Sequence, residues 1–515
     1  MGVFTLLSRF LGLVRDVLMA GFFGTSQAMG GFVIAFTLPN LFRRLFGEGA
    51  LSAAFIPVFI DTRAKEGLAA AWHLAHRVLS LLAVVLTLLT LAGVLLATAG
   101  LLWAEPTGMT ATVLRLSRIM LPYMIFICMV ALCMAILNSF HHFAVPAATS
   151  SILNIVWIGT LLVLVPLVGE TLEQKVTVVA WSVLVAGLLQ LLVQYPILKR
   201  HGYRLQFQLP EDDPRVKRVL VLMGPAALGM GVGQVNVLID KLLAGWIGPW
   251  APAALFYSER LIYFPLGIFA TALSTVLLPT FSGHVSERNE TAMKEMMRDS
   301  LGYILFVMVP ASVGLAALAG PIVSMIFEWG EFGEVSHRQT TLALLFYAPG
   351  LAVFSLAKVF VPVFYAHQDT RTPVYVGLGA VALNLTLNLL AVWTWPHAMK
   401  HAGLAFATVL SSTFNVFVLA YIVHRRIGSP GWRPIIRRFF RCVAISLLMG
   451  ALCILVERWF LDLLAGWGWP VKTALILSVG LAIAAGVAVY LLLSMLTGAP
   501  EMKGMLRTLR SRVRP

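Results

Sequence analysis

Charged residues are scarce in this sequence: Asp, Glu, Lys and Arg make up 12% of its 515 residues, whereas 59% are hydrophobic. Soluble globular proteins carry about 25% charged residues, so this composition leaves almost no room for a soluble domain. Apolar runs of roughly 20 residues recur along the chain, each long enough to cross a bilayer as a helix. The composition therefore predicts an all-α polytopic membrane protein.

Acidic residues are few: the chain has 23 Asp and Glu against 38 Lys and Arg, a net charge of +15. Such an excess of basic residues can indicate nucleic-acid binding, but the positions of these residues in the sequence do not support it. Most of them lie in short loops between apolar runs, where they set the orientation of a membrane protein. We expect membrane lipids as partners, and no nucleic acid.

Cysteines and catalytic motifs are also scarce. The four cysteines lie in apolar runs without metal spacing and are interpreted as small core residues: Cys128, Cys133, Cys442 and Cys453. There is no phosphate-cradling glycine loop, no GxSxG and no HExxH. His141 and His142 have no ligand-spaced partners. The sequence thus predicts a transporter rather than an enzyme, with no cofactor other than a coupling ion considered below.

Fourteen apolar segments are expected to span the membrane. They cover approximately residues 2–24, 29–60, 76–104, 112–139, 145–168, 175–198, 216–247, 252–282, 298–328, 338–366, 373–396, 402–424, 436–460 and 470–497. Several are too long for one straight crossing, so we expect them to be tilted or broken.

The loops support this arrangement. If both termini are cytoplasmic, the cytoplasmic loops and the C-terminal tail hold 24 Lys and Arg, and the opposite loops hold five. Cytoplasmic loops of membrane proteins carry an excess of these residues. We therefore expect both the N-terminus and the C-terminus in the cytoplasm.

A weak internal repeat predicts two similarly oriented halves. GEGALSAAFIPVF (47–59) ends the second segment, and GIFATALSTVLLPTF (267–281) ends the eighth. A shift of six spans predicts two six-helix lobes related by a parallel pseudo-two-fold axis, plus two extra C-terminal helices. The expected parts are an N-terminal lobe (1–200), a cytoplasmic inter-lobe linker (201–218), a C-terminal lobe (219–426), and the last two spans with a basic cytoplasmic tail (427–515).

Several charged residues lie inside the apolar segments. The basic ones are Arg9, Arg15, Arg43, Arg44, Lys241, Arg260 and Lys358, with Asp16, Glu48, Asp240 and Glu259 as acidic company. A charge at mid-bilayer costs about 2.5–3.5 kcal/mol or more, so each must face a partner or a water-filled cavity. Asp16 shares a helix face with Arg9, whereas Arg15 is expected to point elsewhere. Arg44 and Glu48 have the spacing of a helical ion pair.

These charges allow a structural and a functional interpretation. They could be pairs that tie helices together. An excess of arginine spread over both expected lobes instead suits an anionic guest, because guanidinium groups bind phosphate oxygens bidentately and stay charged. We favour function for Arg9, Arg15, Arg43 and Arg260.

Two further features are open to two interpretations. MGPAALGMGVGQ (223–234) brings Pro225 and four glycines into the seventh segment, which suits either a hinge lining a cavity or close helix packing. Asp240, Asn384, Asn388 and Thr408 offer oxygens that suit Na⁺. The alternative, favoured on the residues alone, is an Asn–Asn interhelical hydrogen-bond pair, with Asp240 neutralised by Lys241.

Several stretches resemble one family of membrane transporters. SRFLGLVRD (8–16) and AFTLPNLFRRLFGEGALSAAFIPVF (35–59) are similar to the N-terminal signature of MurJ/MviN-type lipid II flippases, of the multidrug/oligosaccharidyl-lipid/polysaccharide exporter superfamily. FYSERLIYFPLGIFATALSTVLLPTFS (256–282) resembles the family's eighth helix. FYAHQDTRTPV (364–374) resembles its linker between helices 10 and 11.

The resemblance implies a function. The substrate would be lipid II, an undecaprenyl diphosphate carrying a disaccharide-pentapeptide, moved by alternating access to the outer leaflet of the bacterial cytoplasmic (inner) membrane for peptidoglycan synthesis. The substrate-binding residues would be Arg9, Arg15, Asp16, Arg43 and Arg260. The protein would act as a monomer, alongside the cell-wall synthesis machinery.

The resemblance also implies a Na⁺ site, at Asp240, Asn384, Asn388 and Thr408 with a backbone carbonyl near Leu404. The sequence departs from the family at Asn388, where one family position has Asp, and at Gly30, where members often have an acidic residue. Two rival functions stay open. One is a cation-coupled exporter of drugs or other lipid-linked oligosaccharides. The other is a polyprenyl-phosphate transferase, for which the acidic metal-binding motif is missing.

Overall fold

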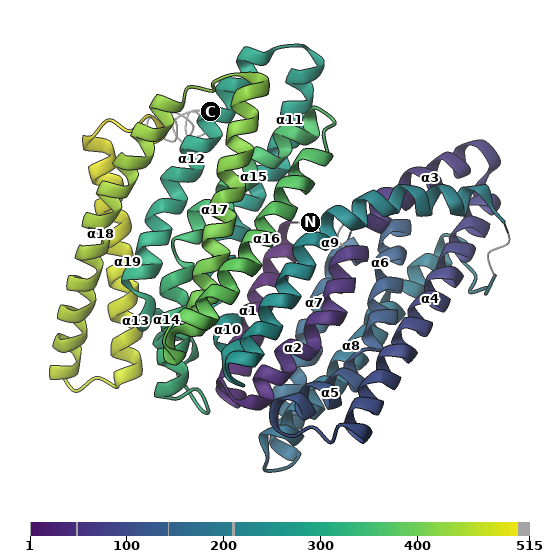
Figure 1. The fold of residues 1–515 in the computed structure, drawn as a ribbon, viewed down its shortest axis with the longest axis horizontal. Coiled ribbons are helices and arrows are strands. Elements are labelled where there is room, and N and C mark those ends of the chain that lie inside the picture. Colours follow the sequence, from purple (N-terminus) through teal and green to yellow (C-terminus); the bar gives the residue numbers. More distant parts are fainter. Residues whose placement is uncertain (1, 48–49, 143, 209–211, 503–515) are drawn as a thin grey trace. The chain divides into compact units, whose positions relative to one another are not determined.

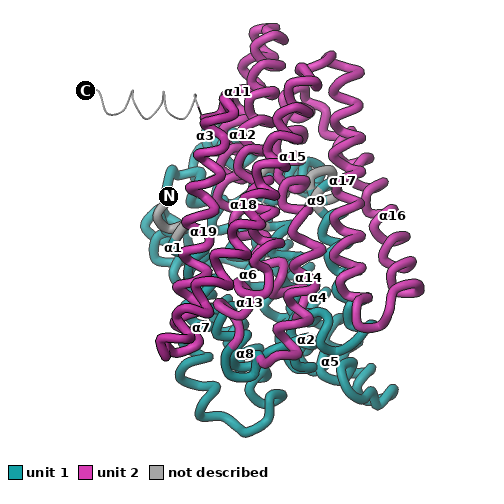
Figure 2. Tube along the Cα trace, turned by 90° about the vertical axis from the view of Figure 1, so that its left-hand side faces the viewer, with its two compact units in different colours: residues 1–253, 329–332 teal, residues 254–328, 333–515 magenta. Residues whose placement is uncertain are grey.

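The computed structural model describes residues 2–47, 50–142, 144–208 and 212–502, and every regular element within these ranges is a helix (Figure 1). The all-α class predicted from composition is therefore confirmed. The chain forms two compact units, shown in different colours in Figure 2. The first comprises residues 1–253 and 329–332, and the second comprises residues 254–328 and 333–515.

The first unit contains the helices up to α9. Their bounds are α1 (Gly2–Phe23), α2 (Gln27–Phe42), α3 (Ala50–Glu66), α4 (Leu68–Trp103), α5 (Gly108–Met120), α6 (Tyr123–Ser139), α7 (Ala144–Gly159), α8 (Leu172–Arg200) and α9 (Pro214–Ile247). Within this unit α2 packs on α5, α7 and α6 pack on α8, and α1 packs on α7. Helix α9, expected to open the C-terminal lobe, packs on α2 and α3.

The second unit contains most of α10 and all later helices. Their bounds are α10 (Ala251–Pro265), α11 (Thr271–Ser286), α12 (Glu290–Ala317), α13 (Ala319–Phe327), α14 (Glu334–Tyr347), α15 (Gly350–Ala366), α16 (Arg371–Thr394), α17 (Lys400–Ile427), α18 (Trp432–Gly466) and α19 (Val471–Leu496). The last two helices pack on each other, and α18 also packs along α12.

The helices account for most of the expected membrane crossings. In the part of the chain that the structure describes, nine helical stretches are long and apolar enough to span a bilayer, or eleven when two bent pairs each count as one span. The bent pairs are α5 with α6, at 43°, and α14 with α15, at 44°. The remaining three expected crossings, α1, α2 with α3, and α9, stay predictions. The expectation that long segments are broken is confirmed by the bent pairs.

Short π-helices interrupt the two segments that carry the internal repeat. One, η1 (Arg43–Gly47), separates α2 from α3, and another, η4 (Leu266–Ala270), separates α10 from α11. A proline lies just upstream of each, Pro39 within α2 and Pro265 at the end of α10. Proline removes a helical hydrogen bond and displaces the backbone, and π-helical turns occur frequently at functional sites. The first of these π-helices carries Arg43 and Arg44.

One short segment of the first unit comes from a distant part of the sequence. Residues 329–332 follow α13, and they pack on the C-terminal end of α1. The Trp329 ring lies edge-on to Phe22 at 6.0 Å between ring centroids. The Glu331 N–H donates to the Gly21 carbonyl at 2.8 Å. A Cβ atom at Gly21 would lie 2.1 Å from the Trp329 ring, so this contact requires glycine there.

Candidate substrate-binding site

Arg15 and Asp16 form a buried ion pair in α1. The Arg15 Nη2–Asp16 Oδ1 distance is 2.6 Å, and Arg15 Nε donates to the same oxygen at 2.9 Å. The Arg15 side chain is 11% exposed and that of Asp16 is 4% exposed. The expectation that Arg15 points away from Asp16 is therefore wrong. Neighbouring side chains leave a helix about 100° apart, but the long arginine side chain turns back to the shorter carboxylate.

Helix α7 contributes two further contacts to Arg15. The Arg15 guanidinium lies over the Trp157 ring at 4.5 Å from its centroid. Its Nη1 donates to Asn154 Oδ1 at 3.1 Å, and the Asn154 amide in turn donates to the Ser8 carbonyl at 3.0 Å. A cation over an indole face is attracted by the ring quadrupole. Arg15 is thus held by a carboxylate, an amide and an aromatic ring within the first unit.

Three other arginines in the predicted membrane segments of the first unit are less deeply buried than Arg15. Arg9, Arg43 and Arg44 are each half-buried. Arg43 Nε donates to Asn40 Oδ1 at 2.9 Å, within the same helical stretch. Arg44 Nη1 donates to Gln234 Oε1 of α9 at 3.4 Å. Glu48, expected to pair with Arg44, lies outside the described residues.

Arg260 lies in α10 of the second unit. It is half-buried, and its guanidinium lies over the Phe256 ring of the same helix at 4.5 Å. The adjacent Glu259 accepts a hydrogen bond from the Tyr347 hydroxyl of α14 at 3.2 Å. The structure therefore places Arg260 in one unit and Arg9, Arg15, Asp16 and Arg43 in the other.

The expected sodium-site residues are also divided between the units. Asp240 lies on α9 in the first unit, where the Asn236 amide donates to its Oδ2 at 3.3 Å. The other four lie on α16 and α17 in the second unit, and they form one connected cluster: Asn384, Asn388, Leu404 and Thr408.

Hydrogen bonds link the members of this cluster. Asn388 Nδ2 donates to Asn384 Oδ1 at 2.8 Å, and Asn384 Nδ2 contacts Thr408 Oγ1 and Ser411 Oγ at 3.4 Å each. Thr408 Oγ1 donates to the Leu404 carbonyl at 3.0 Å. The residues fit a hard cation in ligand type, since amide, hydroxyl and carbonyl oxygens are present. The Asn–Asn hydrogen bond also occurs, but within one helix rather than between two.

Gly30 allows a close approach of α2 to the turn after α9. A Cβ atom at position 30 would lie 1.9 Å from the Pro249 carbonyl oxygen, so no larger side chain fits without a backbone shift. The acidic residue that family members often have here is therefore excluded by packing in this chain.

Several residues of the site are not marked by any pattern in the sequence that we interpreted as functional. Asn154 and Trp157 are three residues apart on α7, a spacing that places them on one helix face. A polar and an aromatic residue on one face of an apolar helix indicate a contact with a polar group, but the sequence does not reveal that this group is Arg15. Gln234, Phe256 and Tyr347 carry no comparable signal, because their roles depend on contacts with other parts of the fold.

Comparisons with known proteins agree in sequence and in structure. The family model of lipid II flippase MurJ matches residues 19–468. The probable lipid II flippase MurJ of Vibrio cholerae is 35% identical over 507 residues, which cover 96% of this chain and 94% of the relative. The lipid II flippase MurJ of Burkholderia cenocepacia is 32% identical, with 87% of each chain covered.

Solved structures show the same fold. A lipid II flippase MurJ in an inward closed conformation matches with a TM-score of 0.77 at 25% identity, over 96% of this chain and 98% of that one. An inward-facing multidrug resistance MATE family transporter matches with a TM-score of 0.68 at 14% identity, over 82% of this chain and 96% of that one, which shows a shared fold alone. The chain belongs to the MurJ lipid II flippase family, a family of multi-pass membrane transporters rather than enzymes.

Proposed function

We propose that this protein flips lipid II from the cytoplasmic to the outer leaflet of the bacterial cytoplasmic membrane, by alternating access, for peptidoglycan synthesis. Family membership and relatives at 30–35% identity over most of the chain support this substrate. The observation that carries the proposal is the set of half-buried arginines on apolar helices: Arg9, Arg43, Arg44 and Arg260. Guanidinium groups stay protonated and bind phosphate oxygens in pairs, as a diphosphate head group requires.

The arginines would have different tasks. Arg15 is neutralised by Asp16 and stacked on Trp157, so we assign it to the wall that supports the binding surface and to a partial contact with the substrate. Asp16 would act on Arg15 rather than on an anionic substrate, which it repels. Arg9, Arg43 and Arg260 would meet the diphosphate. The lipid tail would remain in the hydrocarbon region beside α18 and α19.

Na⁺ is the proposed coupling ion, held by Asn384, Asn388, Thr408 and the Leu404 carbonyl in the second unit. Asn384 and Asn388 would hold the cation through their amide oxygens, Thr408 through its hydroxyl and Leu404 through its backbone carbonyl. Asp240 would add the negative charge that the other four lack. Na⁺-dependent thermal stabilisation that is present in the wild type and missing in Asn384→Ala would support this site, and equal stabilisation in both would oppose it.

The topology and assembly are part of the same proposal. Both termini would lie in the cytoplasm, as the loop charges suggest. The protein would work as a monomer alongside the cell-wall synthesis machinery. The rival is a cation-coupled drug exporter, which shares the fold but whose cationic substrates an arginine-rich surface would repel.

Substrate identity is tested by transport in proteoliposomes. We expect labelled lipid II to reach the opposite leaflet, and a cationic dye offered in its place to stay where it was added. Movement of the dye without movement of lipid II would favour the drug exporter.

A further inference from the structure

The described residues of the segment between α8 and α9 make several contacts with α4 of the first unit. Residues 201–213 are the part of the expected 201–218 linker that lies between α8 and α9, and are called the linker from here on. Within it, Tyr203 is buried beside Trp72, at 5.6 Å between ring centroids. Gln208 donates its N–H to Ser80 Oγ at 3.0 Å, and its side chain meets His73 Nδ1 at 3.3 Å. Residues of α4 thus hold the linker in place before it reaches α9.

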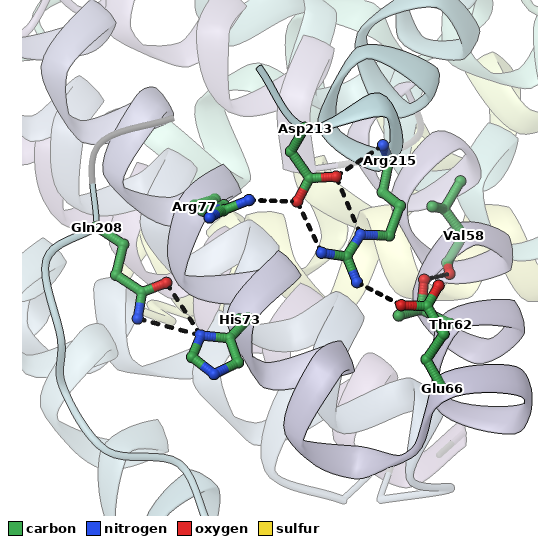
Figure 3. Close-up of polar contacts among 8 residues, drawn as sticks. All are labelled: Val58, Thr62, Glu66, His73, Arg77, Gln208, Asp213 and Arg215. Carbon is green, nitrogen blue, oxygen red and sulfur yellow. Dashed lines mark hydrogen bonds and ion pairs between the residues drawn. The ribbon is translucent and has the colours of Figure 1, made fainter. Parts of the chain in front are cut away.

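Four charged side chains secure the end of the linker (Figure 3). Asp213 accepts from Arg77 Nη1 of α4 at 2.8 Å and from Arg215 Nη2 of α9 at 2.9 Å. Arg215 Nη1 extends to Glu66 Oε2, at the end of α3, at 2.8 Å. We call these four residues, Glu66, Arg77, Asp213 and Arg215, the linker clamp. It ties the start of α9 to the C-terminal end of α3 and to the N-terminal part of α4.

Asp213 is the centre of the clamp. Its side chain is 2% exposed, whereas those of Arg77 and Arg215 are 23% and 27% exposed. Its Oδ1 also accepts the Arg215 backbone N–H at 2.9 Å, so Asp213 is the N-cap of α9. Hydrogen bonds from Arg215 and Arg77 hold the pKa of Asp213 well below its usual range, despite burial. Removing either arginine would leave the negative charge of the buried Asp213 side chain poorly compensated.

A second ion pair extends the attachment along α9. Arg218 Nη1 meets Asp61 Oδ2 of α3 at 3.2 Å, and Asp61 also meets Lys65 Nζ at 2.8 Å. These side chains are more exposed, so their contribution is small. They nevertheless show that the beginning of α9 lies alongside α3, in agreement with the packing of these two helices.

The glycine-rich stretch explains why α9 needs this attachment. A Cβ atom added at Gly224 or Gly233 would meet nothing within 4 Å, and one at Gly231 would make only an ordinary contact with Leu45. Close packing therefore does not require glycine at these three positions. Glycine lowers helix stability, so this stretch is the part of α9 in which bending would cost the least free energy. Beyond it, Gln234 accepts the hydrogen bond from Arg44.

We propose that Asp213 and Arg77 are positioning residues for transport, which fix the cytoplasmic end of α9 on the α3–α4 hairpin and so keep Gln234 against Arg44. The ion pairs of the clamp hold Asp213, the last residue of the linker, in a fixed position against α4. Bending within α9 then takes place in the glycine-rich stretch and not at its first turn. This inference rests on the proposed function only for its effect on transport.

The test combines a distance measurement with transport, on the full chain in lipid. Spin labels at cysteines introduced for Leu88 of α4 and Val221 of α9, both exposed, report the position of α9. Asp213→Asn keeps a capping side chain but removes the charge. We expect a narrow distance distribution in the wild type, a broad one in Asp213→Asn and Arg77→Gln, and partial recovery in Arg77→Lys. Lipid II transport should fall by about tenfold, which corresponds to about 1.4 kcal/mol.

Asp212→Asn is the matched control, because this exposed neighbour should change neither measurement. The double variant Asp213→Asn/Arg77→Gln should be no worse than the poorer single variant, since both remove one interaction. If Asp213→Asn fails to fold, Glu66→Gln offers a milder loss at the same clamp.

Wild-type distances together with wild-type transport in Asp213→Asn and Arg77→Gln would overturn the proposal, as would broadened distances with normal transport. Broadened distances in a protein whose wild type moves no lipid II would instead refute the proposed function and leave the clamp in place.

Discussion

Arg15 and Arg260 are both arginines on apolar helices, but they differ in burial and in the side chains around them. Each lies on an apolar helix, beside a carboxylate in the sequence and over an aromatic ring at 4.5 Å. The ring over Arg15 comes from another helix, α7, whereas the ring over Arg260 belongs to the preceding turn of its own helix. Arg15 is buried and paired with Asp16, while Arg260 is half-buried. The comparison suggests that Arg15 is part of the packing of the first unit, and that Arg260 is more accessible to a ligand.

Asp16→Asn should have the largest effect on stability. It leaves the buried Arg15 without its carboxylate, and breaking a buried ion pair typically costs about 3–5 kcal/mol. Chemical unfolding in detergent measures this loss. Glu259→Gln is the counterpart beside Arg260 and should cost clearly less. Equal losses in the two variants would remove the distinction between the two arginines.

Gly30→Ala should come next. Its Cβ atom would lie 1.9 Å from the Pro249 carbonyl oxygen, so the backbone must move. Overpacking of this kind costs about 1–3 kcal/mol. Gly233→Ala is the control, because its Cβ would meet nothing within 4 Å, and it should be neutral or slightly stabilising. A lower melting temperature is expected for the first variant alone, and a Gly30→Ala protein as stable as the wild type would contradict the close approach.

Replacing the aromatic rings should have a smaller effect. Trp157→Leu removes the ring over the buried Arg15, and cation–π contacts contribute about 0.5–2 kcal/mol, depending on desolvation. Phe256→Leu removes the ring over the more exposed Arg260 and should cost less. Unfolding free energies of the two variants measure the difference, and a larger loss for Phe256→Leu would reverse the proposed ranking of burial.

The smallest expected effect is a dependence of stability on pH that comes from Asp213. This carboxylate contacts two arginines, as Asp16 contacts Arg15, but it lies outside the predicted membrane segments. Its pKa is lowered in the folded state, chiefly by hydrogen bonds from Arg215. An unfolded Asp titrates at about 3.9, so the stability that this group contributes is fully present above about pH 4. It is lost as the pH falls from there through the lowered folded-state pKa. Unfolding measured from pH 6 downward should show a steeper acid loss in the wild type than in Asp213→Asn, and parallel curves would refute this.

The fold was largely predictable because hydropathy determines which segments are buried in lipid. Each of the fourteen expected segments corresponds to one helix or to a broken helix in the structure, and eleven have the length and composition of a span. The breaks at Arg43–Gly47 and Leu266–Ala270 lie at the start of the two repeated stretches, after Pro39 and Pro265, residues that local backbone preferences already mark. The attachment of α9 to α3 was not predictable, because it depends on ion pairs between residues far apart in sequence.

The candidate site was predictable in residue type but not in contacts. Charge in an apolar segment marked Arg15, Arg43 and Arg260 without any knowledge of the fold. The pairing of Arg15 with Asp16 was missed, because helix geometry gives the direction of a side chain at its Cβ and not where a long side chain ends. Trp157 was missed because an aromatic residue in an apolar helix is ordinary until the helix that packs against it is known.

The central claim is that this protein moves lipid II with its arginines, and the most direct measurement is translocation of labelled lipid II in proteoliposomes under an imposed membrane potential. A 100 mV potential contributes about 2.3 kcal/mol per charge moved. The variants are Arg260→Ala and, as a matched control, Arg338→Ala, an exposed arginine near the start of α14. We predict transport by the wild type and by Arg338→Ala, and a loss of about tenfold or more in a folded Arg260→Ala. Unchanged transport in Arg260→Ala, or no transport by folded wild type under a potential or a sodium gradient, would contradict the account.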